Sequence, residues 1–442
     1  MLVMKFGGSS VADRHQISKV LGIVRSHSAK QPLVVSSAHK GVTDALVRAA
    51  REAASGKFDP EPVLSKQRGV AKELGCAPDL LDPLFSEFSD LLRGVHLVRE
   101  LSKRSLDFVA SFGERWSVRV IADFFRREGL AARAYDVWDL GFLTDAEFGT
   151  ARPLPGFEER AKAAVLALPQ NEVPIVTGFV GKTLTGDITT VGRNGSDLTA
   201  TLMAGAIGAT EVQIWSDTDG VMTADPSVVA GARNIPAMRF EEAAELAYFG
   251  SRVLHPATLL PAMAAKIPVR VLNTNRPEHP GTVIAESADN PREVTSIAYK
   301  EGQLVLTINS TRMFGESGFL GRVFEVCARH GVVVDVVTTS EVSVSVTANA
   351  KEPLERAAAE LAKTIGEREV QIHAGRSIVV IVGHHLARKP GLGAEILAAI
   401  ARAGVNVEMI SHAFGSINLS MVVKDEDVAK TALVLHQVLF ER

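Results

Sequence analysis

The stretch between residues 178 and 197 limits the folds open to this chain more than any other feature. It follows an apolar run from Val173 to Val176, is rich in glycine and threonine, and leads into a helical pattern. A strand, a glycine loop and a helix start are typical of open α/β sheets, and they present backbone N–H groups to an anion. Arg193 and Asp197 add a guanidinium and a carboxylate there. The stretch predicts an anion site, with phosphate as the first choice, although a plain loop capped by Ser196 or Asp197 is an alternative.

Length, charge and cysteine usage narrow the class of protein. The 442 residues, 46% of them hydrophobic, exceed one ordinary core and predict about two to four domains. A formal charge of -3 gives no footprint for nucleic acid, so small molecules or further copies of the chain are the expected partners. Cys76 and Cys327 make no metal spacing and no disulfide framework. Without a signal segment or an apolar stretch of about 18 residues, a cytoplasmic protein with no membrane partner is expected.

A second glycine turn lies near the start of the chain. Residues 2–6 predict a strand that ends at Gly7 and Gly8, and a helical pattern and a strand at 33–35 follow. Glycine lets the backbone approach a ligand closely, because it has no Cβ and tolerates positive φ. The turn is not a Walker loop, since Lys5 precedes the glycines. Lys5 would still meet a phosphate as a compact charge, and a purely structural turn is an equal alternative.

Polar residues also follow the second expected strand and open a later helix. Ser37 and Thr43 lie just after residues 33–35, where hydroxyls often only cap the next helix. The segment from Ser111 is expected to open a helix with Glu114 in its first turn. The helix dipole alone would then explain this acid.

Beyond the central stretch, residues 211–215 predict a strand that ends at Ser216 and Asp217. Open α/β sheets bind ligands at the carboxyl ends of their strands, but an Asx turn explains the acid equally well. Helices are expected over 240–248 and 256–265, and a strand over 267–272. His255 has no second His or Cys nearby in the sequence, so no metal site is predicted.

The C-terminal third of the chain repeats itself. Residues 318–335 match residues 391–408. In both copies two glycines are thirteen positions apart, and an acid stands four residues beyond the second glycine. Apolar strands are expected before each copy and after it. They lie at 304–308, 342–346, 378–382 and 417–422. A strand, helix, strand, strand unit is therefore used twice, about 70 residues apart. The proline-containing residues 275–294 have the composition of a boundary.

Taken together, six motifs in register resemble the aspartate kinase family. They are Lys5-Phe-Gly-Gly-Ser-Ser-Val, Ser37-Ala-x-x-Gly-Val-Thr43, Ser111-Phe-Gly-Glu114, residues 178–197, Ser216-Asp-x-Asp-Gly and Phe249-Gly-x-x-Val-Leu-His-Pro-Ala-Thr. The doubled unit resembles the ACT regulatory pair of that family. The resemblance covers nearly the whole chain and implies an α/β amino-acid kinase fold, a mostly parallel sheet sandwiched by helices, followed by two ferredoxin-like ACT domains. It implies a catalytic domain over 1–290, a first ACT domain over 301–375, and a second made of 294–300 with 376–442.

The resemblance also implies the reaction, which is a transfer of the γ-phosphoryl group of ATP, with Mg²⁺, to the side-chain carboxylate of L-aspartate. The product would be 4-phospho-L-aspartate, on the route to lysine. An ionised carboxylate needs no base, so positioning and charge neutralisation carry such a reaction. By resemblance, Lys5 is the catalytic cation that holds the transferring group, and Asp197 orients Lys5.

Binding residues follow from the same resemblance. The implied aspartate site consists of Ser37, Thr43, Glu114, Arg193, Asn194, Gly195 and Ser196. The implied ATP site consists of Lys5, Gly7, Gly8, Ser9, Ser216, Asp217, Met222, Ser227, Arg252 and Val253. Arg193 and Ser196 would grip the α-carboxylate of aspartate, and Glu114 would accept its ammonium. No protein ligand is assigned to the metal, because nucleotide oxygens and water hold magnesium in such sites.

Four positions depart from the family's usual pattern. Asn194 replaces a glycine, and the loop is expected to keep its shape because Asn tolerates a left-handed backbone. Met222, Ser227 and Arg252 replace the usual Tyr, Arg and Lys of the nucleotide segment. Losing a cation and a ring there would weaken ATP binding or shift nucleotide preference, and even Arg for Lys is not neutral. Activity is still expected, because the set of four charged site residues is complete. These are Lys5, Glu114, Arg193 and Asp197.

The first repeat resembles the lysine-sensitive branch of the family, in which an ACT unit binds lysine at a subunit interface. The implied effector residues are Met313, Gly318, Phe319, Leu320, Val334, Asp335, Ser340 and Glu341. Simple packing of the ACT sheet and its dimer is the alternative for them. The resemblance implies end-product inhibition with a coupling of about 1–3 kcal/mol, and a homodimer or tetramer assembled through the ACT domains.

Two other functions stay open at this point. A related kinase acting on a glutamate-type acceptor would share the kinase motifs, although the paired ACT units argue against it. A catalytically weak amino-acid sensor would suit the altered nucleotide segment. The sequence leaves the effector, the choice between dimer and tetramer, the metal ligands and any downstream enzyme undetermined.

Overall fold

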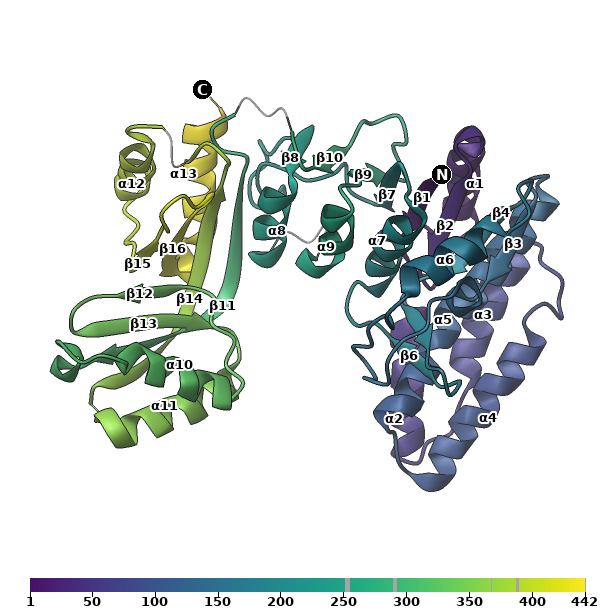
Figure 1. The fold of residues 1–442 in the computed structure, drawn as a ribbon, viewed down its shortest axis with the longest axis horizontal. Coiled ribbons are helices and arrows are strands. Elements are labelled where there is room, and N and C mark those ends of the chain that lie inside the picture. The colour runs from purple at the N-terminus through teal and green to yellow at the C-terminus, as the bar shows by residue number, and fades with distance from the viewer. Residues whose placement is uncertain (251–254, 289–291, 367, 387–388, 442) are drawn as a thin grey trace. The chain divides into compact units, whose positions relative to one another are not determined.

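A computed structural model describes residues 1–250, 255–288, 292–366, 368–386 and 389–441. The chain forms two compact units (Figure 1). The first unit consists of residues 1–221, 236–240 and 253–289, and the second of residues 222–235, 241–252 and 290–442. Residues 222–235 and 241–252 thus group with the C-terminal part of the chain, and the domain boundaries given above stay predictions.

The first unit contains an eight-stranded sheet in the part of the chain that the structure describes. Its order is β3 (Ala132–Tyr135), β4 (Val173–Thr177), β2 (Pro32–Ser36), β1 (Leu2–Phe6), β7 (Glu211–Ser216), β9 (Val269–Asn273), β10 (Thr282–Ala285) and β8 (Ala237–Arg239). Neighbouring strands are parallel apart from the antiparallel pair β9 and β10. β2 and β4 are fully buried, as expected for short apolar runs covered on both faces.

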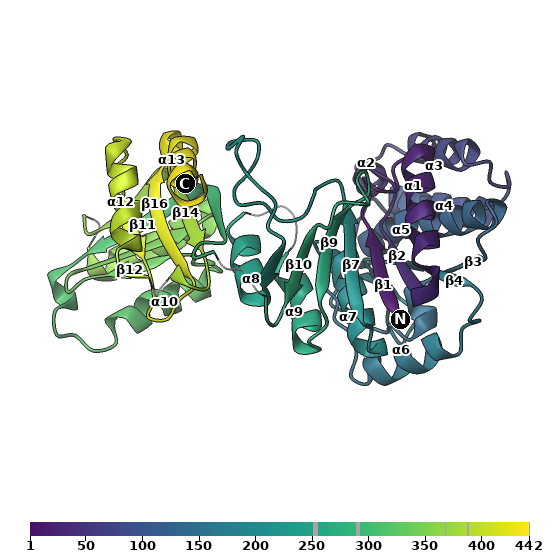
Figure 2. The ribbon, with the colours of Figure 1, turned by 90° about the horizontal axis from the view of Figure 1, so that it is seen from above.

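Helices pack against this sheet in two groups (Figure 2). α7 (Gly195–Ile207) contacts β1 and β7 and lies against α6 (Phe157–Leu166) and α9 (Pro256–Ala264). α5 (Lys103–Arg127) contacts β2, β3 and β4 and lies against α2 (Val42–Ala54) and α4 (Asp82–Val98). The remaining elements are α1 (Arg14–Ser26), α3 (Glu61–Glu73) and the 3-10 turns η1 (Ser28–Lys30) and η2 (Val137–Leu140). Phe88 of α4 packs edge to face against Phe112 and Trp116 of α5.

The start of α5 corrects one expectation from the sequence. The helix begins at Lys103, after Ser102, whose Oγ accepts a hydrogen bond from the backbone N–H three residues further on. Ser111 lies inside the helix, where its hydroxyl donates to a backbone carbonyl of the preceding turn at 2.7 Å. Glu114 is therefore buried in the middle of α5 and not in a first turn, so the helix dipole does not account for it.

A hairpin of β5 (Val180–Lys182) and β6 (Ile188–Thr190) carries the middle of the 178–197 stretch. Asp107 of α5 anchors it. The carboxylate accepts hydrogen bonds from the backbone N–H groups of Gly149 and Thr190, both at 2.8 Å, and from the Thr190 hydroxyl at 2.9 Å. Burial raises the pKa of the Asp107 carboxyl above its usual value, against the effect of these donors. The stretch is thus held to α5 before it enters α7.

The second unit contains a six-stranded antiparallel sheet among the described residues. Its order is β12 (Val337–Thr339), β13 (Ser343–Ala348), β11 (Ser296–Asn309), β14 (Val370–Val382), β16 (Asn418–Lys424) and β15 (Met409–Ser411). The long strands β11 and β14 pair with each other and run through both halves of the sheet. Each predicted repeat thus supplies half of one continuous sheet.

Two hydrophobic clusters lie on this sheet. One is formed by residues between 306 and 370, and the other by residues 294–297 with residues between 379 and 435. The helices of the first half are α10 (Phe319–Arg329) and α11 (Lys351–Ile365), and those of the second are α12 (Leu392–Arg402) and α13 (Val428–Phe440). The unit also holds α8 (Phe240–Tyr248) beyond its first residue and the 3-10 turns η3 (Thr311–Met313) and η5 (Asp425–Asp427). The doubled unit predicted from the sequence is confirmed.

Candidate active site

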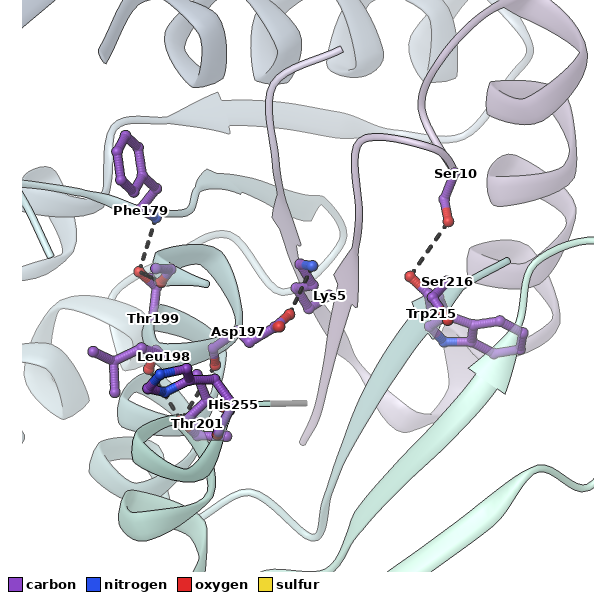
Figure 3. Close-up of polar contacts among 12 residues, drawn as sticks. Lys5, Ser10, Phe179, Asp197, Leu198, Thr199, Thr201, Trp215, Ser216 and His255 are labelled. Atoms are coloured by element: carbon purple, nitrogen blue, oxygen red, sulfur yellow. Dashed lines mark hydrogen bonds and ion pairs between the residues drawn. The ribbon is translucent and has the colours of Figure 1, made fainter. Parts of the chain in front are cut away.

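A buried ion pair joins the first strand of the first unit to α7. Lys5 lies near the carboxyl end of β1, and Asp197 lies in the first turn of α7. The Lys5 Nζ and Asp197 Oδ1 atoms are 2.6 Å apart, and the two side chains are 12% and 8% exposed (Figure 3). Because the residues are far apart in the sequence, only the order of the strands brings them together. The expected contact between Lys5 and Asp197 is present, and the catalytic roles assigned to them stay predictions.

The glycine turn after β1 leaves open space beside the Lys5 ammonium. A Cβ atom added to Gly7 would lie 3.4 Å from Lys5 Nζ, and one added to Gly8 would lie 3.0 Å from the carbonyl oxygen of Ala38. The Gly7 N–H donates to the Trp215 carbonyl at 3.2 Å, which ties the turn to the end of β7. A side chain at Gly7 would crowd the Lys5 ammonium, and one at Gly8 would press against the Ala38 carbonyl, so the two glycines keep the backbone of the turn accessible to a ligand.

The start of α7 has the left-handed backbone expected for its unusual asparagine. Asn194 is the N-cap residue, with φ 54° and ψ 29°, and its side chain makes no capping hydrogen bond. Ser196 and Asp197 lie inside the helix and do not cap it. A Cβ atom at Gly178 would lie 2.5 Å from the Cβ atom of Ser196, so the end of β4 and the helix start are in close contact. The N-terminus of α7 therefore stands at the carboxyl edge of the sheet, where an anion is stabilised.

Glu114 brings a partly unpartnered carboxylate to the carboxyl edge of the sheet, next to the end of β2. Its Oε1 atom accepts a hydrogen bond from the Ala38 N–H at 3.1 Å, while its buried Oε2 atom has no partner among the described residues. Burial raises the pKa of Glu114 to about 8, although the Ala38 N–H and the charge of Lys5 oppose the rise. A buried carboxylate oxygen without a donor favours a ligand that supplies one.

The other predicted residues of the first unit lie at strand or helix ends nearby. The Ser37 N–H donates to the Phe6 carbonyl at 3.1 Å. A Cβ atom at Gly113 would lie 3.5 Å from Thr43 Oγ1, so Thr43 faces α5 close to Glu114. Arg193 is exposed, and no hydrogen bond or ion pair of its guanidinium occurs among the described residues.

Residues predicted to bind the nucleotide are only partly described. Ser216 ends β7 and Asp217 follows it, with the Ser216 hydroxyl 3.1 Å from that of Thr218. Met222 and Ser227 belong to the second unit, and Ser227 is held by hydrogen bonds from its N–H and its hydroxyl to an aspartate two residues earlier. Arg252 and Val253 lie outside the described residues. The roles assigned to all of these residues stay predictions.

One feature of this site was not singled out from the sequence. Phe179 has a left-handed backbone, with φ 66°, which is rare for a bulky residue. Its N–H donates to Thr199 Oγ1 at 3.1 Å, and a Cβ atom at Gly195 would lie 2.7 Å from its ring (Figure 3). Backbone strain of this kind gathers at ligand sites, but nothing in the sequence pattern signals a left-handed Phe. Asp219, two residues after Asp217, is bound by Asn273 and Arg276, at 2.7 and 2.5 Å.

The effector residues predicted in the second unit lie around the start of α10 and the edge strand β12. Gly318 is the N-cap residue of α10, with φ 85°, Phe319 is buried and Leu320 is exposed. Met313 ends η3 and is half-buried. The Ser340 hydroxyl lies 2.7 Å from that of Ser343. Glu341 is exposed, and Val334 is half-buried just before Asp335.

Asp335 is already engaged by side chains of this chain. Its carboxylate lies 2.7 Å from Lys300 Nζ and accepts a hydrogen bond of 2.5 Å from the Tyr248 hydroxyl. The Lys300 ammonium is also 4.9 Å from the centroid of the Tyr248 ring. The Asp335 side chain is only 2% exposed. Burial and the neighbouring Asp335 carboxylate raise the pKa of Tyr248, so this hydroxyl is a firm donor.

The site of the first unit has the parts of a small-molecule kinase of the open α/β class. An ammonium, glycine backbone and a helix N-terminus meet at the carboxyl edge of a mostly parallel sheet, where phosphate groups bind. The Glu114 carboxylate beside them suits an acceptor molecule that carries an amino group. No group of three or more His, Cys, Asp or Glu suited to a metal ion occurs among the described residues.

Comparisons with known proteins agree with this class. Residues 1–273 match the model of the amino acid kinase family, and residues 379–439 match an ACT domain. The chain is 38% identical to the chloroplastic aspartokinase 2 of Arabidopsis thaliana, over 99% of this chain and 84% of that protein. It is 34% identical to the lysine-sensitive aspartokinase 3 of Escherichia coli, over 100% of this chain and 99% of that protein. The chain belongs to the aspartokinases of the amino acid kinase family, as the sequence motifs predicted.

Solved structures of E. coli aspartokinase III resemble the whole chain. The complex with aspartate and ADP, described as the R-state, has a TM-score of 0.83 at 33% identity and full coverage of both chains. The complex with lysine and aspartate, described as the T-state, has a TM-score of 0.78 at 33% identity, covering 100% of this chain and 99% of the other. The amino-acid kinase fold with C-terminal ACT domains is thereby confirmed. Within the described residues, no helix combines the length and apolar character needed to cross a bilayer.

Proposed function

We propose that this aspartokinase transfers the γ-phosphoryl group of ATP to the side-chain carboxylate of L-aspartate and is regulated through its ACT domains. The observation that carries the proposal is the buried Lys5–Asp197 pair between a glycine turn and a helix N-terminus. The Lys5 ammonium would neutralise charge on the transferring group, and Asp197 would fix its position. Similarity to aspartokinases over the full chain supports the acceptor.

The substrate aspartate would be oriented through its α-carboxylate and its α-ammonium group. Arg193, whose guanidinium is exposed, and Ser196 at the start of α7 would bind the α-carboxylate, and the free Oε2 atom of Glu114 would accept the ammonium. A side-chain carboxylate oxygen then attacks the γ-phosphorus while the bond from that phosphorus to the β–γ bridging oxygen breaks. ADP leaves with the electron pair, and no proton is transferred, because both the nucleophile and the leaving group are oxyanions.

The residues present fit a magnesium nucleotide. A Cβ atom at Gly7 would fill space next to the Lys5 ammonium. Phosphate oxygens suit that space because they carry the opposite charge. Because no acidic cluster able to hold a metal occurs among the described residues, we propose that phosphate oxygens and water hold most of the magnesium shell. When bound, the metal would neutralise phosphate charge.

A hydroxylamine trap tests this function. The chain is incubated with ATP, Mg²⁺ and either L-aspartate or L-glutamate, and the acyl phosphate is captured as a hydroxamate. Hydroxamate with aspartate alone supports the proposal. Hydroxamate with glutamate indicates the other acceptor class, and none with either acid indicates an amino-acid sensor, for which the Met222 and Ser227 departures are the supporting feature.

We further propose that lysine is the effector and that it binds at the residues around Asp335. The lysine complex of the E. coli relative supports this choice. Asp335 already accepts an ammonium and a hydroxyl from its own chain, so an incoming amino group must share or displace these donors. A titration in which millimolar lysine changes neither aspartate saturation nor association state would reject lysine as effector.

We also propose that copies of this chain assemble into a dimer or tetramer through their ACT domains. Large apolar side chains are exposed on the second unit, among them Phe314 at 72%, Val333 at 64% and Phe414. Exposed apolar surface of this kind is typical of an interface. Light scattering of the purified chain, with and without lysine, distinguishes monomer, dimer and tetramer. The cytoplasmic location stays a prediction.

A further inference from the structure

A cavity of about 410 Å³ in the first unit is not used by the proposed reaction. Its walls come from α4, α5, the turn at η2 and the β5–β6 hairpin. None of the residues assigned to aspartate or ATP lines it. The volume falls in the range of about 300–1,000 Å³ that small-molecule sites occupy.

Arg115 brings unused hydrogen-bond donors to this cavity. The residue is 8% exposed, and its Nη2 atom lies 2.9 Å from the Glu87 carboxylate. Its Nη1 and Nε atoms are buried and make no hydrogen bond among the described residues, although Nε lies 3.9 Å from an Asp136 oxygen. Although Arg115 follows Glu114 in the sequence, a helix turns about 100° per residue, so the two side chains leave α5 in different directions. A buried guanidinium N–H without an acceptor is costly and calls for one.

Lys182 supplies the second cation. Its ammonium lies 5.6 Å from the centroid of the Trp138 ring, and no ion pair of Lys182 occurs in the described part of the chain. The other charges that line the cavity have partners. Arg104 lies 3.3 Å from Asp187, and Asp136 is bound by Arg119 at 2.9 Å. The cavity therefore offers an anion the Lys182 ammonium, which makes no ion pair among the described residues, and the Arg115 guanidinium. Its Nη1 and Nε atoms lack acceptors there, and its Cζ atom lies 4.9 Å from the centroid of the Phe112 ring.

The remaining wall is apolar and limits the kind of anion. Leu91, Phe108, Trp138 and Ile188 line the cavity together with the charged residues. The carboxylates of Glu87, Asp136 and Asp187 line the cavity as well and offset its three cations, so the wall has no excess positive charge to hold a multiply charged anion such as phosphate. We propose that this cavity binds a small monocarboxylate with an apolar body, its carboxylate on Arg115 and Lys182 and its body against Trp138. An apolar amino acid and a simple carboxylic acid share this chemistry.

Calorimetric titration of the full chain tests the proposal, with L-aspartate present so that the proposed aspartate site does not contribute. The probes are L-leucine, 4-methylpentanoate, isopentylamine and inorganic phosphate. Lys182→Met removes the charge and keeps a side chain that covers Trp138. Lys162→Met, at an exposed position of α6, is the matched control. Fluorescence of Trp138, compared with that of Trp138→Phe, reports binding in the cavity itself.

The expected result is that L-leucine or 4-methylpentanoate binds, that Lys182→Met weakens it about tenfold, and that Lys162→Met leaves it unchanged. Tighter binding of leucine identifies an amino acid as the ligand class, and tighter binding of the plain acid identifies a carboxylic acid. The proposal is overturned if neither carboxylate binds, if the amine binds as well as they do, or if phosphate binds in their place. Equal binding to Lys182→Met and to the unaltered chain overturns it as well. These outcomes do not depend on the hydroxamate assay, so this site and the proposed reaction fail separately.

Discussion

Among the residues that the structure describes, each unit contains one Lys–Asp ion pair, and the two pairs differ in what surrounds them. The Lys5–Asp197 pair stands beside glycine backbone and a helix N-terminus, and the Oε2 atom of Glu114, which has no partner among the described residues, lies at the same carboxyl edge of the sheet. The Lys300–Asp335 pair is completed by the hydroxyl and ring of Tyr248. The first pair is placed to meet a ligand, whereas a ligand at the second must compete with groups of the chain itself.

The largest effect should come from breaking the first pair. Lys5→Met removes the only cation of that pair, and we expect kcat to fall about 10²–10³-fold, or roughly 3–4 kcal/mol of transition-state stabilisation. The hydroxamate assay measures it, with circular dichroism to confirm folding. Lys300→Met is the matched control, because it removes the ammonium of the other pair. A Lys5→Met variant as active as Lys300→Met would contradict the role of Lys5.

The pH dependence of aspartate binding sharpens the comparison. The raised pKa of Glu114, about 8, means that this carboxyl is protonated below that pH and cannot accept an ammonium. We expect the KM for aspartate to rise about tenfold as the pH falls from about 9 to about 7, following the ionised fraction. In Glu114→Gln the KM should be higher and nearly independent of pH. A pH-independent KM in the unaltered chain would argue against Glu114 as the ammonium acceptor.

The Glu114 carboxyl also makes the stability of the folded protein depend on pH. A folded-state pKa above the usual 4.5 means that the folded protein holds a proton that the unfolded chain has released. Stability should therefore fall as the pH rises from about 5 to 8. Glu114→Gln should remove this fall and be more stable than the unaltered chain at about pH 9. Thermal unfolding across this range measures the difference.

A smaller effect is expected at the second pair. If the effector's amino group uses Asp335, removing its internal competitor in Lys300→Met should lower the lysine concentration for half-inhibition about fivefold, or roughly 1 kcal/mol. Inhibition curves at fixed aspartate measure the shift, and Lys351→Met, at an exposed position of α11, is the control. An unchanged or higher half-inhibition concentration in Lys300→Met would show that the two ammonium groups do not compete.

The smallest effect concerns the backbone beside the first pair. Asn194 has φ 54°, a conformation that glycine adopts without strain. Asn194→Gly should change the free energy of unfolding by less than about 1 kcal/mol and leave kcat nearly unchanged. Asn194→Val should cost more, because a β-branched residue is strained there. Denaturant unfolding of the three proteins ranks them, and a Val variant as stable as the Gly variant would show that the left-handed backbone is not retained.

Local patterns predicted the elements that carry the site. The strand at residues 2–6, the glycine turn after it and the strand before the 178–197 stretch are present, because short apolar runs bounded by glycine have few other buried solutions. The start of α5 was mispredicted. Ser111 has the residue type of a cap, but its hydroxyl bonds inside the helix, while Ser102 caps the actual start. Two serines stand near this helical pattern, and the sequence alone does not show which of them lies next to the unbonded backbone N–H groups at the helix start.

The sequence by itself determined the family, the doubled unit and the chemical types of the site residues, since these depend on residue identity, order and spacing. The tertiary structure decided which charges meet. Lys5 reaches Asp197 because β1 lies beside β2 and β7 in the sheet, and Asp335 is satisfied by a tyrosine and a lysine that no pattern linked to it. It also decided that Glu114 is deeply buried and that Arg115, next to it, lines another cavity. Contacts between distant segments depend on the packing of the whole sheet, so they cannot be predicted from the spacing of residues within one segment.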